Sequence, residues 1–186
     1  MPYKIKKQYR HPEQDYSDDG FYFITICTKN RVELFGDIVG AEMVLSEDGK
    51  IAEKFWLNIP GHFSFVKLEE FIIMPNHIHG LINIVGTGHC PVPASDLNER
   101  TGQCPVPTRR SRFGHVTPKS ISTIIGSFKS IVTKTINQKY QTNNIIWQPR
   151  FHDRIIRKED ELNKIRQYII DNPLKWGLDR NNPINL

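Results

Sequence analysis

Two histidines separated by one residue, His77 and His79, are the side chains in this sequence best suited to chemistry. They lie in the stretch 71–84, where two apolar runs flank a short polar centre. Side chains alternate along a strand, so a strand here would direct both imidazoles to one face and Ile78 to the other. Neutral imidazole is a common ligand of divalent transition metals, so the pair is half of a metal site. The alternative is a buried, hydrogen-bonded pair without a metal, and the spacing alone leaves both interpretations open.

A tyrosine and an asparagine form a second candidate pair near the end of the chain. Tyr168 and Asn172 are four residues apart and therefore neighbours on one face of a helix. A phenol acts as a nucleophile only when a base or a metal assists it, and an amide oxygen can complete a metal shell. The alternative is structural: Tyr168 packs against Ile165, and Asn172 caps the helix before Pro173.

The strands that position these residues are predicted from β-branched and aromatic runs. They are expected at 21–28, 63–74 and 77–85, with a last strand formed by 145–147 and 151–156 and broken at Pro149. The run through 71–84 also fits one long strand bent at 74–76, because a proline there cannot donate a hydrogen bond to a sheet ladder.

Three helices are predicted from their caps and apolar stripes. Ser46 is the expected N-cap of the first, which ends at the Pro-Gly pair 60–61. Thr117, followed by a proline, is the expected start of the second, whose apolar stripe runs over 121–136. The third spans about 158–171 and ends where a proline follows.

Residues 86–116 lack a hydrophobic period and are rich in Gly, Pro, Ser, Thr and Arg. They contain a repeat, because Thr-Gly-His-Cys-Pro-Val-Pro at 87–93 recurs with one change at 101–107. Two copies of seven residues are too few and too short for a repeat architecture. The chain of 186 residues is therefore predicted to be one domain, 1–186, with a flexible insertion at 86–116.

Charge and composition narrow the class of protein. The net charge of +5 is compatible with a polyanionic partner but does not by itself indicate one. No apolar run approaches the length of a membrane span, so no membrane partner is expected. Three cysteines without Cys-x-x-Cys spacing favour a reducing, cytoplasmic setting. Basic side chains that could contact a nucleic acid, or instead form ion pairs within the protein, are Lys129, Arg154 and Arg157.

Several of these motifs resemble a known family. The string 74–80, Met-Pro-Asn-His-Ile-His-Gly, is similar to REP-associated tyrosine transposases, which are relatives of the single-tyrosine insertion-sequence transposases. Its His-Ile-His centre resembles the signature of the HUH single-strand nucleases. Further similar stretches lie at 22–25, 128–130, 147–153 and 168–173, so the resemblance covers nearly the whole chain except the insertion.

The resemblance implies an α+β, ferredoxin-like fold: an antiparallel sheet with helices on one side and the two histidines on a central strand. It further implies that His77 and His79 bind Mg²⁺ or Mn²⁺, with Asn172 as third ligand, and that Tyr168 is the nucleophile. Related transposases often carry glutamine at the position of Asn172.

The activity implied is metal-dependent cutting and joining of single-stranded DNA at a hairpin formed by a palindromic repeat. It would proceed through a 5′-phosphotyrosine intermediate, in transposition or in repeat processing, by a monomer or a homodimer. Two other functions remain open: a non-catalytic nucleic-acid-binding module on the same fold, and a metal hydrolase that does not act on DNA. A metal-dependent covalent adduct with DNA distinguishes the first function from both.

Overall fold

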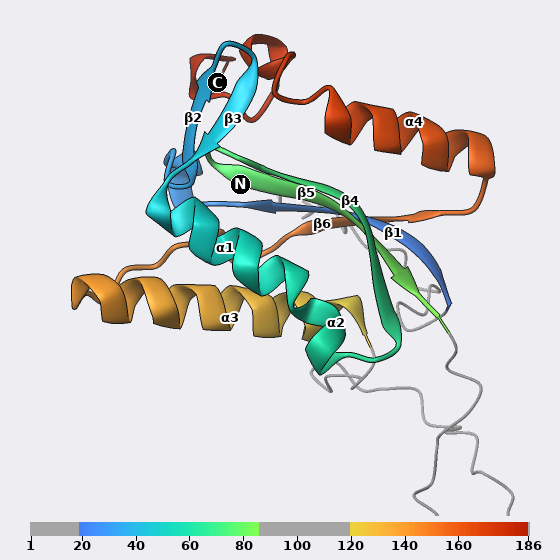
Figure 1. Ribbon diagram of the computed structural model, residues 1–186, viewed down its shortest axis with the longest axis horizontal. Coiled ribbons are helices and arrows are strands. Elements are labelled where there is room, and N and C mark those ends of the chain that lie inside the picture. Colours follow the sequence, from blue (N-terminus) through green and yellow to red (C-terminus); the bar gives the residue numbers. More distant parts are fainter. Residues whose placement is uncertain (1–18, 86–119, 186) are drawn as a thin grey trace, which may run out of the picture.

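The structure is a computed structural model that describes residues 19–85 and 120–185 (Figure 1). The predicted insertion at 86–116 and the predicted helix start at Thr117 lie outside the described residues. Within these two ranges, no helix combines the length and the apolar character needed to span a bilayer.

A four-stranded antiparallel sheet forms the centre of the fold. Its strands are β1 (Gly20–Cys27), β4 (Val66–Met74), β5 (His77–Ile84) and β6 (His152–Ile156), in the order β4-β5-β1-β6. A helix connects β1 to β4 and another connects β5 to β6, which is the ferredoxin-like split βαβ arrangement. The predicted α+β fold is confirmed, and the histidine pair lies on the central strand β5.

The stretch 71–84 forms two strands joined by a tight turn rather than one bent strand. Met74 pairs with His77 in the β4–β5 ladder, which leaves Pro75 and Asn76 in the turn. The Pro75 carbonyl accepts hydrogen bonds from the backbone N–H groups of residues 34 and 35, at 2.8 and 2.9 Å. Pro75 therefore lies where its missing N–H removes no ladder bond.

Helices α1 (Glu47–Leu57) and α3 (Ile121–Tyr140) cover one face of the sheet (Figure 1). The hydroxyl of Ser46 accepts from the Gly49 N–H at 3.0 Å, so the predicted cap of the first helix is confirmed. The helix ends at Leu57, earlier than the predicted end at residues 60–61. Those two residues lie in a separate short helix, α2 (Ile59–His62). The N-cap of α3 is Ser120, so the helix starts after the predicted position.

Helix α4 (Glu159–Ile170) lies on the opposite face of the sheet (Figure 1). Its Leu162 and Ile169 pack with Leu81 of β5 and Ile156 of β6 in a second apolar cluster. The expectation that helices cover one side therefore holds for α1 and α3 and not for α4. The physical reason is that the second face also carries apolar side chains, Leu81 of β5 and Ile156 of β6, which need a covering layer.

A two-stranded hairpin, β2 (Gly36–Val39) and β3 (Glu42–Leu45), was not predicted. Its turn residues Gly40 and Ala41 both have positive φ, 60° and 66°. Hairpin turns of this kind are usually signalled by Asn-Gly or Asp-Gly, and an alanine at the second position gives no such signal.

Gly80 follows the histidine pair and is the point at which the sheet accepts a large aromatic ring. A Cβ built on Gly80 would lie 2.2 Å from Cζ2 of Trp56. Trp56 is fully buried and packs edge-on against Phe128 of α3, with ring centroids 5.2 Å apart. The glycine is therefore required by the close approach of the indole to the strand.

We predict that Gly80→Ala lowers the free energy of unfolding by about 1–3 kcal/mol, because the added methyl group must displace a packed indole. Gly126→Ala is the matched control, since nothing lies within 4 Å of a Cβ at this position in α3. It should be neutral or stabilise the protein by up to about 1 kcal/mol. Urea unfolding of both variants measures the difference, and equal stability of the two would contradict the packing argument.

Candidate active site

Strand β5 directs both imidazoles to the face that α4 covers. The rings of His77 and His79 lie with centroids 4.5 Å apart at an interplanar angle of 74°. Ile78 between them belongs to the core on the other face. Both histidines are buried, at 0% and 1% exposure, so neither can satisfy its ring nitrogens with bulk water.

The turn residue Asn76 sets the tautomer of His77. The Asn76 amide nitrogen donates to the backbone carbonyls of Arg31 and Asn181, at 3.1 and 2.8 Å. Its side-chain oxygen therefore faces Nδ1 of His77, at 2.9 Å, and accepts the Nδ1 proton. This arrangement leaves the lone pair of His77 on Nε2, which is buried and has no hydrogen-bond partner.

His79 uses both ring nitrogens. Nδ1 lies 2.9 Å from the hydroxyl oxygen of Thr25 on the neighbouring strand β1. Nε2 lies 3.2 Å from the phenolic oxygen of Tyr168, which α4 brings across the sheet. The ring of Phe23 stacks on that of His79, with centroids 5.2 Å apart, and excludes solvent from that side.

Both imidazoles are held in the neutral form. Burial, together with the nearby cations of Arg31 and Arg180, lowers the pKa of His77 to about 3. Burial also lowers the pKa of His79 well below its ordinary value, and the neighbouring His77 adds to this effect. Neutral imidazole is the form that binds metals, so the site needs no deprotonation at neutral pH.

A carboxylate that was not predicted, Asp179, completes the cluster. One ligand atom from each of His77, His79 and Asp179 lies within 4.8 Å of the others, and all three residues are buried. The backbone N–H of Asn181 donates to Oδ1 of Asp179 at 2.6 Å, which fixes the carboxylate. The guanidinium of Arg31 holds this segment by donating to the Arg180 carbonyl and to Oδ1 of Asn181.

Asn172 lies beside this carboxylate. Its side-chain N–H donates to Oδ2 of Asp179 at 3.2 Å, and its Oδ1 is buried without a hydrogen-bond partner. The C-cap of α4 is Asp171, so capping of the helix does not account for the buried amide of Asn172. The structure therefore places Tyr168 beside His79 and Asn172 beside Asp179, while the predicted roles of Tyr168 and Asn172 stay predictions.

The phenol of Tyr168 is not activated by its protein surroundings. Partial burial raises its pKa above the ordinary value, and the carboxylate of Asp179 raises it further. The side chain remains 39% exposed, so a substrate can reach it from solvent. A nearby positive charge would offset both effects and favour the phenolate.

The donor set fits a divalent cation. Two buried acceptor atoms of the site, Nε2 of His77 and Oδ1 of Asn172, have no hydrogen-bond partner in the described structure. Unpartnered buried acceptors are rare, and a cation held by His77, His79 and Asp179 would satisfy the free nitrogen of His77. Mixed nitrogen and oxygen ligands suit a transition ion such as Mn²⁺ better than Mg²⁺, which prefers oxygen.

An ion-pair cluster fixes α4 to the sheet one half-turn from Tyr168. The Arg166 guanidinium donates to Glu69 at 2.8 Å and to Glu70 at 3.1 Å. The β4–β5 register shifts between residues 68 and 71, so the two glutamates occupy a bulge in β4. A bulge can turn consecutive side chains toward the same partner, which explains how both carboxylates reach one arginine.

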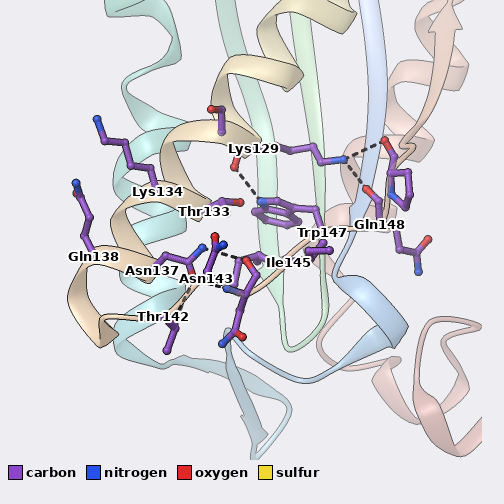
Figure 2. A pocket seen from close by; sticks show the side chains of 14 residues that line it. Lys129, Thr133, Lys134, Asn137, Gln138, Thr142, Asn143, Ile145, Trp147 and Gln148 are labelled. Atoms are coloured by element: carbon purple, nitrogen blue, oxygen red, sulfur yellow. Dashed lines mark hydrogen bonds between the residues drawn. The ribbon is translucent and has the colours of Figure 1, made fainter.

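The three predicted DNA contacts lie outside this cluster. Arg154 forms an ion pair with Glu161, and Arg157 follows the end of β6. Lys129 lies on α3, beside a polar pocket of about 840 Å³ between α3 and residues 142–149 (Figure 2). Its ammonium donates to the carbonyls of Gln148 and Pro149, at 2.5 and 3.4 Å. Lys129 therefore anchors this segment on the side of the sheet away from the histidines.

The chain is similar to a known protein in sequence and to a solved structure in fold. No family model matches the chain. The chain is 36% identical over 177 residues to an uncharacterized protein of Haemophilus influenzae, and the match covers 94% of this chain and 92% of that protein. The chain belongs to the family of this protein.

Among solved structures, a REP-associated tyrosine transposase bound to a REP hairpin has a similar fold. The TM-score is 0.57 at 17% identity, over 92% of this chain and 76% of the other. The resemblance indicated by the sequence motifs is therefore confirmed at the level of fold. A second structure, from Deinococcus radiodurans, aligns with 87% of this chain and 97% of the other at 16% identity and a TM-score of 0.43, too low to support a conclusion.

We predict that Asp179→Asn weakens Mn²⁺ binding by at least about tenfold, because the site loses its one charged ligand group. Calorimetric titration of the purified protein with Mn²⁺ measures this. Asp171→Asn is the matched control, since that carboxylate lies at the C-cap of α4 and pairs with Lys175 at 2.9 Å. Unchanged Mn²⁺ affinity in the Asp179→Asn variant would show that the carboxylate does not belong to the metal site.

Proposed function

We propose that this protein is a metal-dependent transposase-type enzyme that cuts and joins single-stranded DNA, with Tyr168 as the nucleophile. The observation that carries the proposal is the 3.2 Å contact between the Tyr168 hydroxyl and Nε2 of His79, inside a cluster of metal-ligating groups. The solved structure of similar fold contains a REP hairpin, which supports hairpin DNA as the substrate class. Transposition and repeat processing are the two roles that such an activity would serve.

The covalent step uses the phenolic oxygen of Tyr168. This oxygen attacks the phosphorus of a DNA phosphodiester, and the bond from phosphorus to the 3′ oxygen breaks. The phenolic proton passes to solvent and the departing 3′ oxygen takes up a proton, so the products are a 5′-phosphotyrosine and a free 3′-hydroxyl. The ester bond is conserved in the adduct, so attack by another 3′-hydroxyl can rejoin the strand.

His77, His79 and Asp179, with Asn172 beside them, would hold Mg²⁺ or Mn²⁺. When bound, the cation supplies Lewis acidity, which favours the phenolate and stabilises charge that develops on the phosphate. The protein residues do the remaining work. Asn76 keeps Nε2 of His77 unprotonated, and Thr25 orients the ring of His79.

We predict that Tyr168→Phe abolishes the covalent adduct with a hairpin-bearing oligonucleotide in the presence of Mn²⁺, because the phenyl ring has no nucleophilic oxygen. Denaturing gel electrophoresis detects the adduct as a protein band of raised mass. Tyr140→Phe is the control, since Tyr140 is exposed at the end of α3 and contacts Lys139 instead of the histidines. Adduct formation by Tyr168→Phe would exclude Tyr168 as nucleophile, and its absence from the unaltered protein would favour a non-catalytic binding module.

We further predict that Arg166→Gln slows adduct formation by about tenfold or more while leaving Mn²⁺ affinity unchanged. The reason is geometric, because Arg166 holds the helix that carries Tyr168, and small displacements of a reacting group cost large factors in rate. Single-turnover kinetics at saturating Mn²⁺ measure the effect. Lys175→Gln, which removes an exposed ion pair with Asp171, is the control and should react at the normal rate.

A further inference from the structure

A second pocket, distinct from the histidine cluster, opens at the end of β1. It has a volume of about 620 Å³ and is lined by Lys29, Asn30, Arg31, Gln148, Pro149 and Arg150. Three of these six residues are cations and none is acidic. A hollow with this charge is suited to a polyanion.

Hydrogen bonds connect two sides of the pocket to segments next to the histidine cluster. Arg31 lines the pocket and also donates to the Arg180 carbonyl and to Asn181, at 3.0 and 2.6 Å, immediately after Asp179. On the other wall, the backbone N–H of Gln148 donates to the carbonyl of Cys27 at 3.0 Å. Cys27 is the ladder partner of His77, so the pocket lies at the end of the sheet where His77 begins β5.

The walls of the pocket are fixed by internal contacts. Lys129 of α3 donates to the carbonyls of Gln148 and Pro149 (Figure 2). These two hydrogen bonds fix the backbone immediately before Arg150. On the opposite wall, Asn30 and Arg31 both adopt left-handed backbone, with φ of 54° and 55°. Asparagine adopts this conformation more readily than most residues, whereas arginine seldom does, and two hydrogen bonds of its guanidinium hold Arg31 in place.

We propose that this pocket, formed by residues 29–31 and 148–150, binds the sugar-phosphate backbone of the DNA strand next to the phosphate that Tyr168 attacks. The inference rests on the proposed function, since it assumes that a single strand reaches the histidine cluster. Charge complementarity is the main support, because single-stranded DNA is bound chiefly through basic grooves that follow its backbone. The exposed side chains of Lys29 and Arg150 provide the contacts, while Arg31 shapes the wall.

The test compares two charge-matched double variants of the full chain, each made in the Tyr168→Phe background so that no adduct forms. Lys29→Gln with Arg150→Gln removes two cations from the pocket. Lys54→Gln with Lys67→Gln removes two exposed cations from α1 and β4, away from it. Fluorescence anisotropy then measures the affinity for a hairpin-bearing single-stranded oligonucleotide at several salt concentrations.

We expect the pocket variant to bind about tenfold or more weakly at low salt. Its plot of log affinity against log salt should be shallower by about 1.4, because each phosphate contact of a single strand contributes about 0.7. The control variant should keep nearly the normal affinity and slope. Equal losses in the two variants would assign the effect to net charge and overturn the inference, as would normal binding by the pocket variant.

Adduct formation separates this inference from the proposed function. With Tyr168 intact and DNA at saturating concentration, the pocket variant should still form the covalent adduct. If the unaltered protein forms no adduct but the pocket variant binds DNA more weakly than the control, the proposed function fails and the pocket remains a DNA-binding site. If the adduct forms normally and the two variants bind alike, the function stands and the inference fails.

Discussion

Strand β5 is buried on both of its faces, and the candidate site depends on this constraint. Ile78, Ile82 and Ile84 pack into the core beneath α1 and α3, whereas Leu81 packs under α4. The side chains of His77 and His79 share the second face, so the two imidazoles are enclosed between sheet and helix. Because a one-residue slip would exchange the two faces, the apolar core fixes the position of the histidines.

Burial of these imidazoles determines their chemistry. The protonated form is disfavoured inside the protein, so the rings remain neutral, and an unpartnered nitrogen is left on His77. Such an atom costs stability unless something binds it, which is the physical reason to expect a cation there. Asp179 supplies the negative charge that a cation site needs, and it also raises the pKa of Tyr168. The site alone therefore disfavours the phenolate form of Tyr168, and a divalent ion bound there would favour it.

The sequence predicted those parts of the site that depend on local periodicity. Alternation along 77–84 predicted that His77 and His79 share one face. The spacing of four predicted that Tyr168 and Asn172 are neighbours on one helix, but α4 ends at Ile170, so Asn172 lies just beyond its C-cap. Asp179 was missed because it lies in an irregular segment, and hydrogen bonds from residues far away in the sequence hold that segment in place. The role of Asn76 depends on the same long-range contacts. Lys129 was predicted as a DNA contact, but its ammonium is engaged by backbone carbonyls that no local pattern indicates.

The most direct measurement is a crystal structure of the protein soaked in Mn²⁺, with an anomalous difference map recorded at the manganese edge. We expect one strong peak within about 2–2.5 Å of Nε2 of His77, a ring nitrogen of His79 and a carboxylate oxygen of Asp179, beside the hydroxyl of Tyr168. Absence of that peak at saturating Mn²⁺, or a peak remote from Tyr168, would contradict the claim that these residues form a single metal-assisted site.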